Sequence, residues 1–210
     1  MIIAGGYDKS RKGMIDMEFS TFKKLAFKRR TIRRFTPEPV STNILKDLVD
    51  LGRIAPAGGN SQAVEYIIVN REDMREKLFP LLRWAASLPP DMRTPEEGRR
   101  PMAYIIVLLN TEIKKGGDHD VGAAVENILL GATSVGLGAC WMGAIDRKKI
   151  RTLLNVPKTH DVKHVISIGY PDEESVMEVY DDSFKYWKDD GGRMHVPKRE
   201  LDGVILKIVD

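Results

Sequence analysis

Short runs of branched and aromatic residues alternate with helical patterns along most of this chain. Three runs have the composition of buried strands: VEYIIVN at 64–70, AYIIVLLN at 103–110 and VKHVISIGY at 162–170. A further apolar segment occupies 136–145. Between these runs, apolar residues recur three and four positions apart, which is the period of an amphipathic helix. Strands that alternate with helices predict a layered α/β fold, although the pattern does not specify the order of the strands.

The helical patterns have recognisable starts and stops. In the helix expected from Ser41 or Thr42 to the stop at Pro56, the residues expected to face inward are Ile44, Leu48, Leu51 and Ile54. The pattern that begins at Asp120 is apolar nearly all round, so we expect a buried helix. Further helices are expected at 18–28, at 71–79 and after Asp146.

Length and composition limit the classes of protein. The 210 residues suit one folding unit, which we expect at 17–210, with residues 1–16 as an N-terminal extension of no sustained period. The 33 basic and 30 acidic residues leave a net charge of +3, too small to argue for nucleic acid. The single Cys140 cannot form an internal disulfide and is expected to be a buried, inert thiol. With no signal peptide or membrane-length apolar run evident, we expect a cytoplasmic location and no membrane partner.

The segment 88–101 has four prolines and many charges, which predicts a surface loop or a lid. Trp84 precedes it and is expected to anchor the loop, with stacking on a substrate as the alternative. Trp141 and Trp187 are expected to be packing residues. His160 and His164 are four positions apart but lack a carboxylate arranged for zinc. We therefore predict no metal site.

The stretch KRRTIRRF at 28–35 concentrates cations beside a hydroxyl group. If the segment is extended, alternation places Arg29, Thr31 and Arg33 on one side, with Arg30 and Arg34 on the other. Guanidinium groups bind phosphate through paired hydrogen bonds, and a threonine hydroxyl can donate beside them. The alternative is a solvated basic helix end, in which the cations complement the helix dipole.

The stretch APAGGNSQ at 55–62 is a glycine-rich turn that carries two side-chain amides. Gly58 and Gly59 let the backbone approach a ligand closely, and Asn60 and Gln62 supply donors and acceptors. The alternative is a helix stop followed by an ordinary turn. Together, the two stretches predict a site for a phosphorylated, planar cofactor that forms hydrogen bonds.

These blocks resemble the FMN-dependent nitroreductase family. The resemblance covers about Met17 to Lys198 and is specific as a set. It is carried by RRTIRRF at 29–35 with PV at 39–40, by the Ala-Pro turn that ends in Asn60-x-Gln62, by 120–146, by 160–171 and by the basic pair at 198–199.

The resemblance implies a three-layer α/β/α nitroreductase-like fold, a central mixed sheet flanked by helices. It also implies a homodimer with FMN at the subunit interface. Arg33 would stabilise charge at the N1 and O2 edge of the ring, and the other implied cofactor contacts fall into three groups. The phosphate and ribityl end would meet Arg29, Arg30, Thr31, Lys198 and Arg199. The ring or ribityl chain would meet Ala57, Gly58, Asn60 and Gln62, partly from the partner subunit. Backbone N–H groups near Met142, Gly143 and Ala144 would form hydrogen bonds to N5 and O4.

The reaction implied by the resemblance is a ping-pong transfer of hydride from NADH or NADPH to a nitroaromatic, quinone or similar acceptor, without an obligatory protein acid or base. No GxGxxG motif joins a strand to a helix, so a Rossmann domain for the nicotinamide is not predicted. This chain departs from the family at two places. It has Ala63-Val64 where many members carry Pro-Trp, and Gly143-Ala144 where some members carry Glu-Gly. Two alternatives therefore remain: a specialised flavin reaction, such as reductive dehalogenation or flavin fragmentation, and a non-enzymatic module that binds anions or nucleic acid.

Overall fold

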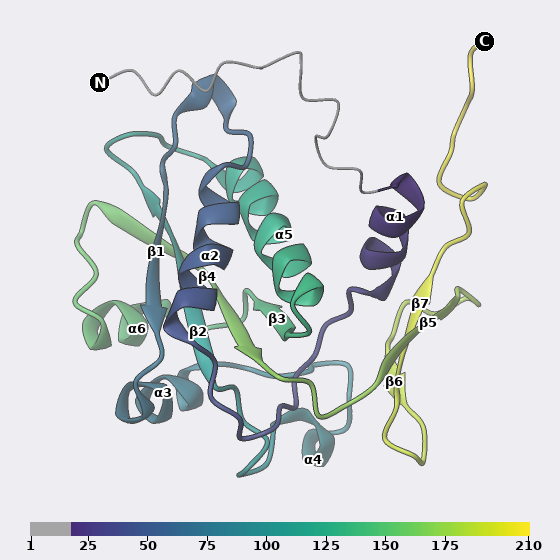
Figure 1. Cartoon of the computed structure of the whole chain (residues 1–210), viewed down its shortest axis with the longest axis horizontal. Helices are drawn as coiled ribbons and strands as arrows, with labels where there is room; N and C mark the ends of the chain where they lie inside the picture. Colours follow the sequence, from purple (N-terminus) through teal and green to yellow (C-terminus); the bar gives the residue numbers. More distant parts are fainter. Residues whose placement is uncertain (1–17) are drawn as a thin grey trace.

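The computed structural model describes residues 18–210, so the extension expected at 1–16 lies outside the described residues (Figure 1). The central sheet has four strands in the order β1 (Val64–Val69), β2 (Ala103–Asn110), β4 (His160–Gly169) and β3 (Gly138–Met142). All the strand segments expected from the sequence therefore form strands. Within residues 18–210, no helix is both long and apolar enough to cross a membrane.

The expectation of a mixed central sheet is corrected in one respect. Each neighbouring pair of the four strands is antiparallel. A parallel contact is made at the edge of this sheet, where Thr31 forms an isolated bridge with Ala139 of β3. Continuous apolar runs are typical of parallel strands because both of their faces are buried. Here helices cover both faces of an antiparallel sheet, and β2 is buried along almost its whole length for that reason.

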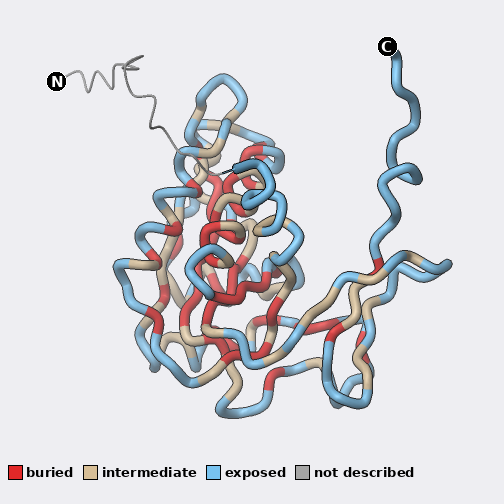
Figure 2. The backbone as a smooth tube through the Cα atoms, turned by 45° about the vertical axis from the view of Figure 1, so that its right-hand side comes forward, coloured by how far each residue is buried: buried red, intermediate tan, exposed pale blue. Residues whose placement is uncertain are grey.

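Helices cover the two faces of the sheet and complete three layers (Figure 1). On one face, α2 (Thr42–Arg53) and α5 (Asp118–Ser134) pack against alternate β2 residues such as Ile105 and Val107. On the other, α3 (Glu72–Leu78) and α6 (Arg147–Leu153) pack in the cluster that contains Ile106 and Leu108. In Figure 2 the buried segments gather inside the body of the protein and the exposed ones lie around it. The three-layer α/β/α fold is confirmed.

The inward face of α2 differs from the one expected. Leu48 is buried as expected, but its buried companions are Leu45 and Gly52, whereas Leu51 is 38% and Ile54 60% exposed. A side chain on Gly52 would meet the Tyr66 hydroxyl group at 2.8 Å, so the close approach of helix and sheet selects a glycine on the inner face. Local periodicity does not reveal such an approach. Ser41 caps the helix by accepting a hydrogen bond from the Asn43 N–H.

The other helices begin close to where they are expected. The helix α1 spans Phe19–Lys28, and α5 begins at Asp118, two residues before the expected start. The expectation that α5 is buried all round is not met in one chain: its buried residues form one broad face, while Ala123, Glu126 and Leu130 on the other face are only partly buried. Asp146 caps α6 by accepting from the Lys149 N–H at 3.1 Å, as expected.

The segment 88–101 contains the short helix α4 (Pro90–Arg93) and is anchored to the body of the protein. Trp84 is 5% exposed and packs on Phe79, with ring centroids 5.6 Å apart, in the buried cluster that also contains Leu88 at the start of the segment. The Arg34 side chain also holds the segment, because its Nε donates to Glu96 at 2.9 Å.

A second, three-stranded sheet follows the core and was not expected from the sequence. Its order is β5 (Ser175–Val179), β7 (Met194–Lys198) and β6 (Trp187–Lys188). These strands are short and only partly buried, so their apolar pattern is weak. Beyond β7 the chain runs away from the body as an exposed tail, 199–210 (Figures 1 and 2).

Candidate functional site

The basic stretch runs alongside the edge strand β3. The Ile32 N–H donates to the Ala139 carbonyl at 3.0 Å, next to the Thr31–Ala139 bridge. Gly138 and Gly169 pair across β3 and β4, and a Cβ on either would come within 2.8 Å of Ile32 or Phe35. The two glycines therefore provide the space in which the basic stretch lies against the sheet.

The first two arginines of this stretch take different positions. Arg29 Nε lies 3.2 Å from Glu126 Oε1 on α5. Arg30 folds back and donates to the Phe27 carbonyl at 3.0 Å, at the end of α1. Its buried Nε has no hydrogen-bond partner among residues 18–210, and it lines a cavity of about 220 Å³. Burial and the nearby Arg29 charge lower the pKa of Arg30, a cost that an anion bound here would reduce.

Arg33 and Arg34 share one buried carboxylate that sequence reasoning missed. Glu173 accepts from the Arg33 N–H at 2.6 Å and lies 3.7 Å from Arg34 Nη1. It also pairs with Lys188 of β6 at 3.0 Å, and its side chain is only 2% exposed. The Arg33 guanidinium lies over the ring of Tyr186, 4.8 Å from its centroid. The only signal in the sequence was an acidic residue shortly after the last core strand.

The glycine-rich turn is tied to the first turn of α5. The Gly58 N–H donates to Asp120 Oδ1 at 3.0 Å, and Lys114 Nζ lies 2.6 Å from Asp120 Oδ2. The Gly58 N–H, followed by Lys114, lowers the pKa of the Asp120 carboxyl group. Asp120, expected to mark a helix N-terminus, also positions the turn.

The two amide residues of this turn adopt left-handed backbone conformations, with φ of 50° at Asn60 and 51° at Gln62. Asn60 is exposed, and the Gln62 side chain makes only a long contact of 3.5 Å to the Asn60 carbonyl. Ala57 and Gln62 line a small cavity of about 100 Å³ beside Asp120. The amides are therefore displayed at the surface, where they are available to a ligand.

Within one chain, the basic stretch and the glycine-rich turn lie at different places along α5. The turn is bound at Asp120, whereas Arg30 shares its cavity with Thr133 near the other end of the helix. These two helix positions are about 20 Å apart at 1.5 Å per residue. Figure 1 shows the same separation, with the turn above β1 and the basic stretch descending from α1.

The segment that follows β3 carries the expected backbone donors. Met142 is buried, while Gly143 and Ala144 are exposed. The carbonyl group of Gly143 accepts from Arg147 Nη2, and that of Ala144 from the Arg83 N–H, both at 3.0 Å. The N–H groups of Gly143 and Ala144 have no backbone partner within the described part of the chain. The carbonyl groups hold the segment while its N–H groups remain available.

Lys198 and Arg199 lie at the far end of the second sheet. The Lys198 carbonyl accepts from the Tyr180 N–H at 2.8 Å. The sheet is joined to the basic stretch through the ion pair between Lys188 and Glu173. Lys188 of β6 lies opposite Met194 in the neighbouring strand β7. Lys198 lies four residues further along β7, about 13 Å away at strand spacing. The structure thus links the element that carries Lys198 to the basic stretch without a direct contact between them.

The fold and the site together define a class. The chain is an α/β/α protein with a cationic stretch along one sheet edge, backbone donors further along the same edge and a displayed amide turn elsewhere. Such donors suit an elongated ligand with a phosphate at one end and a hydrogen-bonding ring at the other.

Comparison with known proteins identifies the family. Residues 26–170 match the model of the nitroreductase family. A protein of Archaeoglobus fulgidus, provisionally named NADH dehydrogenase/NAD(P)H nitroreductase, is 30% identical over 169 residues, which cover 77% of this chain and 91% of the relative. The chain therefore belongs to the nitroreductase family, a family of oxidoreductases.

Solved structures agree with this assignment. A provisionally assigned nitroreductase of Desulfovibrio desulfuricans, solved in complex with FMN, is 26% identical, with a TM-score of 0.62 over 90% of this chain and 97% of that one. An FMN-dependent nitroreductase of Clostridium difficile R20291 is 28% identical, with a TM-score of 0.59 over 75% of this chain and 91% of that one.

Proposed function

We propose that this protein is an FMN-dependent oxidoreductase that takes hydride from NADH or NADPH and passes it to a nitroaromatic, quinone or similar electron-poor acceptor. One observation carries the proposal. The basic stretch and the N–H groups of Gly143 and Ala144 lie along one edge of β3, where Thr31 meets Ala139 and Gly143 follows about 13 Å further on. The family membership and the FMN complex of the Desulfovibrio relative support it.

We assign the residues as follows. The phosphate and ribityl end binds Arg29, Arg30 and Thr31, with Lys198 and Arg199 from the end of β7. The unpartnered Arg30 Nε fits such an anion, because a buried donor without an acceptor is costly. Arg33 addresses the N1 and O2 edge, and the N–H groups near Met142, Gly143 and Ala144 address N5 and O4.

The separation along α5 supports a homodimer with FMN at the interface. The turn that carries Ala57, Gly58, Asn60 and Gln62 is bound at Asp120 of α5. Arg29 contacts α5 at Glu126 and Arg30 lies near Thr133, about 9 Å and 20 Å further along the helix, and we propose that the turn completing the site comes from a second copy. We propose 17–210 as one FMN-binding domain and 1–16 as an extension. Burial raises the pKa of the Cys140 thiol to about 11, and this unreactive single cysteine fits a cytoplasmic location.

When bound, FMN would supply the redox chemistry of both half-reactions, which alternate in a ping-pong order. The chain's own part is electrostatic. The cation of Arg33, stacked on Tyr186, stabilises negative charge at the ring edge, and Glu173 holds the Arg33 backbone in place. A fixed N–H pair at Gly143 and Ala144 orients the opposite edge.

Absorption spectroscopy and FMN titration test this proposal. The purified protein should be yellow, and Arg29→Ala and Arg33→Ala should each weaken FMN binding about tenfold or more through loss of charged hydrogen bonds. Arg71→Ala is the control, because Arg71 is exposed and pairs with Asp73 on the surface. A colourless protein that does not bind added FMN would exclude the proposed cofactor.

Steady-state kinetics test the reaction. Parallel double-reciprocal plots for NAD(P)H and a quinone or nitroaromatic are expected from the ping-pong order, while intersecting plots contradict it. Turnover of a halotyrosine without turnover of either acceptor would favour the specialised flavin reaction. Salt-sensitive anion or nucleic-acid binding without a flavin spectrum would favour the non-enzymatic module.

A further inference from the structure

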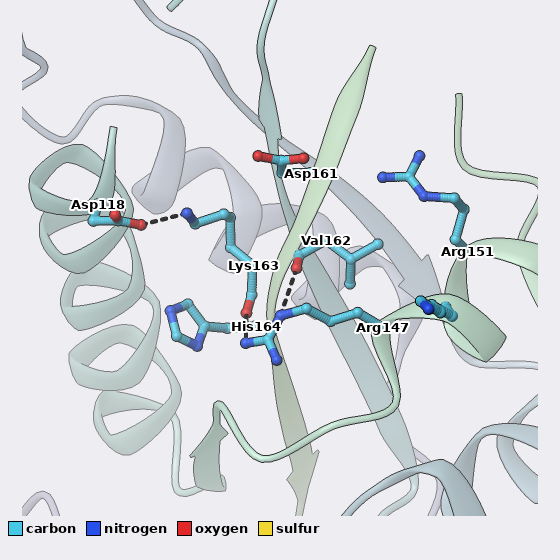
Figure 3. Close-up of a pocket in the computed structure, with 8 residues that line it drawn as sticks. Asp118, Arg147, Arg151, Asp161, Val162, Lys163 and His164 are labelled. Atoms are coloured by element: carbon cyan, nitrogen blue, oxygen red, sulfur yellow. Dashed lines mark hydrogen bonds and ion pairs between the residues drawn. The ribbon is translucent and has the colours of Figure 1, made fainter. Parts of the chain in front are cut away.

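A second cavity lies beside the start of β4, outside the residues assigned to FMN. It has a volume of about 490 Å³ and lies between the N-terminal end of α5, the start of β4 and α6 (Figure 3). That volume is within the range of small-molecule sites. We call it the bulge cavity, after the irregularity in β4 that shapes it.

The bulge is a single extra residue in β4. Val107 of β2 is opposite His164 and the next residue, Leu108, is opposite Val162, which leaves Lys163 without a counterpart. Arg147 binds the backbone here, donating from Nε to the Val162 carbonyl at 3.1 Å and from Nη2 to the Lys163 carbonyl at 3.0 Å. Bulges of this kind commonly redirect side chains next to active sites.

The same guanidinium connects the cavity to the segment proposed to meet the flavin. Arg147 Nη2 also donates to the Gly143 carbonyl at 3.0 Å. His164 adjoins that segment from the cavity side, since a Cβ on Gly143 would lie 3.4 Å from His164 Nδ1. The bulge cavity and the Gly143 segment therefore share a wall.

Positive charge exceeds negative charge around the bulge cavity. Four cations line it, and two carboxylates oppose them. Arg147 and Arg151 donate mainly to neutral backbone carbonyls, which leave their charge uncompensated. Lys163 pairs with Asp118 at 2.5 Å, whereas Lys148 has no ion pair within residues 18–210. A concave surface with this excess attracts anions.

His164, which also lines the bulge cavity, carries a ring nitrogen that can form a hydrogen bond to a ligand. Its ring meets Trp141 edge to face at 5.2 Å, and its buried Nδ1 has no hydrogen-bond partner in the described chain. Burial, with the Arg147 and Lys163 cations adding to it, lowers the pKa of His164 although the Met142 carbonyl and Asp118 oppose the shift. Near neutral pH the imidazole is therefore uncharged and can donate or accept a hydrogen bond.

We propose that the bulge cavity binds an anionic group, phosphate or carboxylate, of a substrate whose reacting end lies at the Gly143 segment. Lys148, Lys163 and His164 are the contacting residues. This inference rests on the proposed function and adds a substrate class to it: one of the two substrates carries an anion. The anion belongs either to the nicotinamide dinucleotide or to the acceptor.

Binding of inorganic pyrophosphate to the FMN-saturated protein tests the site without turnover, because FMN then fills the phosphate position at Arg29 and Thr31. In NMR spectra recorded during a pyrophosphate titration, the backbone amide signals of residues 147–148 and 162–164 should shift together and reach saturation. Lys148→Gln and Lys163→Gln should each weaken this binding about fivefold or more. Lys149→Gln is the matched control, since Lys149 is on the same helix but pairs with Asp146 and is not among the residues that line the bulge cavity.

Weak shifts spread over many surface lysines, or equal losses in all three variants, would overturn the site. If the protein binds no FMN but these signals still saturate with pyrophosphate, the proposed function fails and the anion site remains. If FMN binds and the signals do not move, only the anion site fails.

Kinetics with nitrobenzene and 4-nitrobenzoate, which differ by one carboxylate, identify the source of the anion. If Lys163→Gln raises KM for 4-nitrobenzoate alone, the anion belongs to the acceptor. If it raises KM for NAD(P)H with either acceptor, the anion belongs to the dinucleotide. Unchanged KM values for all of these substrates would overturn the assignment to a substrate.

Discussion

Glu173 is the residue on which the geometry of the basic stretch most depends. Its buried carboxylate faces two cations, Lys188 and Arg34, and accepts the backbone N–H of Arg33. Because both cations have side chains less than 10% exposed, neither can exchange this partner for water at low cost.

Replacing Glu173 by Gln should lower the free energy of unfolding by about 3–5 kcal/mol, since it leaves two buried cations without their shared carboxylate. Thermal unfolding measures the effect. The control is Glu174→Gln, because Glu174 is 61% exposed and pairs with Arg193 at the surface. Equal melting temperatures for the two variants would contradict this role for Glu173.

His195 makes the second sheet sensitive to pH. Its ring is stacked on Trp187 and lies between Asp189 at 3.2 Å and Glu178 at 3.1 Å. The hydrogen bond to Asp189, with help from Glu178, raises the pKa of His195 above its ordinary value of 6.5, while the same contact lowers the pKa of Asp189. Protonated His195 and ionised Asp189 therefore stabilise each other.

Because the folded pKa of His195 is raised, its stabilising effect is complete below about pH 6.5 and is lost as pH rises through the folded value. The melting temperature of the wild type should exceed that of His195→Gln near pH 6, and the difference should shrink towards pH 9. His119→Gln serves as a control on an exposed histidine of α5. A difference that grows with pH would show that the linkage has the opposite sign.

Among the elements, the glycine pair of β3 and β4 decides where the basic stretch can lie. Ile32 and Phe35 occupy the space that side chains on Gly138 and Gly169 would need. Ile32 is branched at Cβ and 8% exposed, so it has little room to move. The position of the basic stretch therefore depends on Gly138 and Gly169, which the sequence alone indicated only as members of apolar strand segments.

Gly138→Ala should destabilise the protein by about 1–3 kcal/mol through overpacking against Ile32, and it should weaken FMN binding by displacing Thr31. Gly122→Ala on α5 is the matched control, because its Cβ would meet only Trp141, at 4.0 Å. This second change should be neutral or stabilise by up to about 1 kcal/mol, as alanine favours a helix interior. Melting temperatures and FMN titrations of both variants distinguish a steric effect at Gly138 from a general effect of adding a methyl group.

Across the described residues, 18–210, several large apolar side chains of α1 and of the C-terminal tail are exposed. Phe19 and Phe27 of α1 are 78% and 55% exposed, and Ile208 and Val209 of the tail are 70% and 79% exposed. Large apolar side chains exposed in this number are available to a partner. Together with the separation of the two ligand stretches along α5, it favours a second copy of the chain as the partner.

The protein should therefore sediment as a dimer, and the double change Phe19→Ser and Phe27→Ser should weaken dimerisation at least tenfold. Analytical ultracentrifugation over a range of concentrations measures this. Ile113→Ser is the control, since Ile113 is 51% exposed but lies in the turn after β2. A monomeric wild type at micromolar concentration would contradict the proposed interface site.

Much of the fold follows from short-range patterns. The four core strands, the helices between them and the Asp146 cap could be predicted, because periodicity, capping and turn chemistry depend on neighbours in sequence. The basic stretch and the glycine-rich turn were recognisable for the same reason. Their residue types show which chemistry they can perform.

Contacts between distant residues decided the rest. Strand direction, the glycine inner face of α2 and the bulge at Lys163 follow from how elements pack, which local periods do not record. Arg33 and Glu173 meet across 140 positions of sequence. The sequence alone thus determined the elements and the candidate ligand chemistry. Only the tertiary structure decided that the two ligand stretches lie apart in one chain, because their distance depends on where each contacts α5.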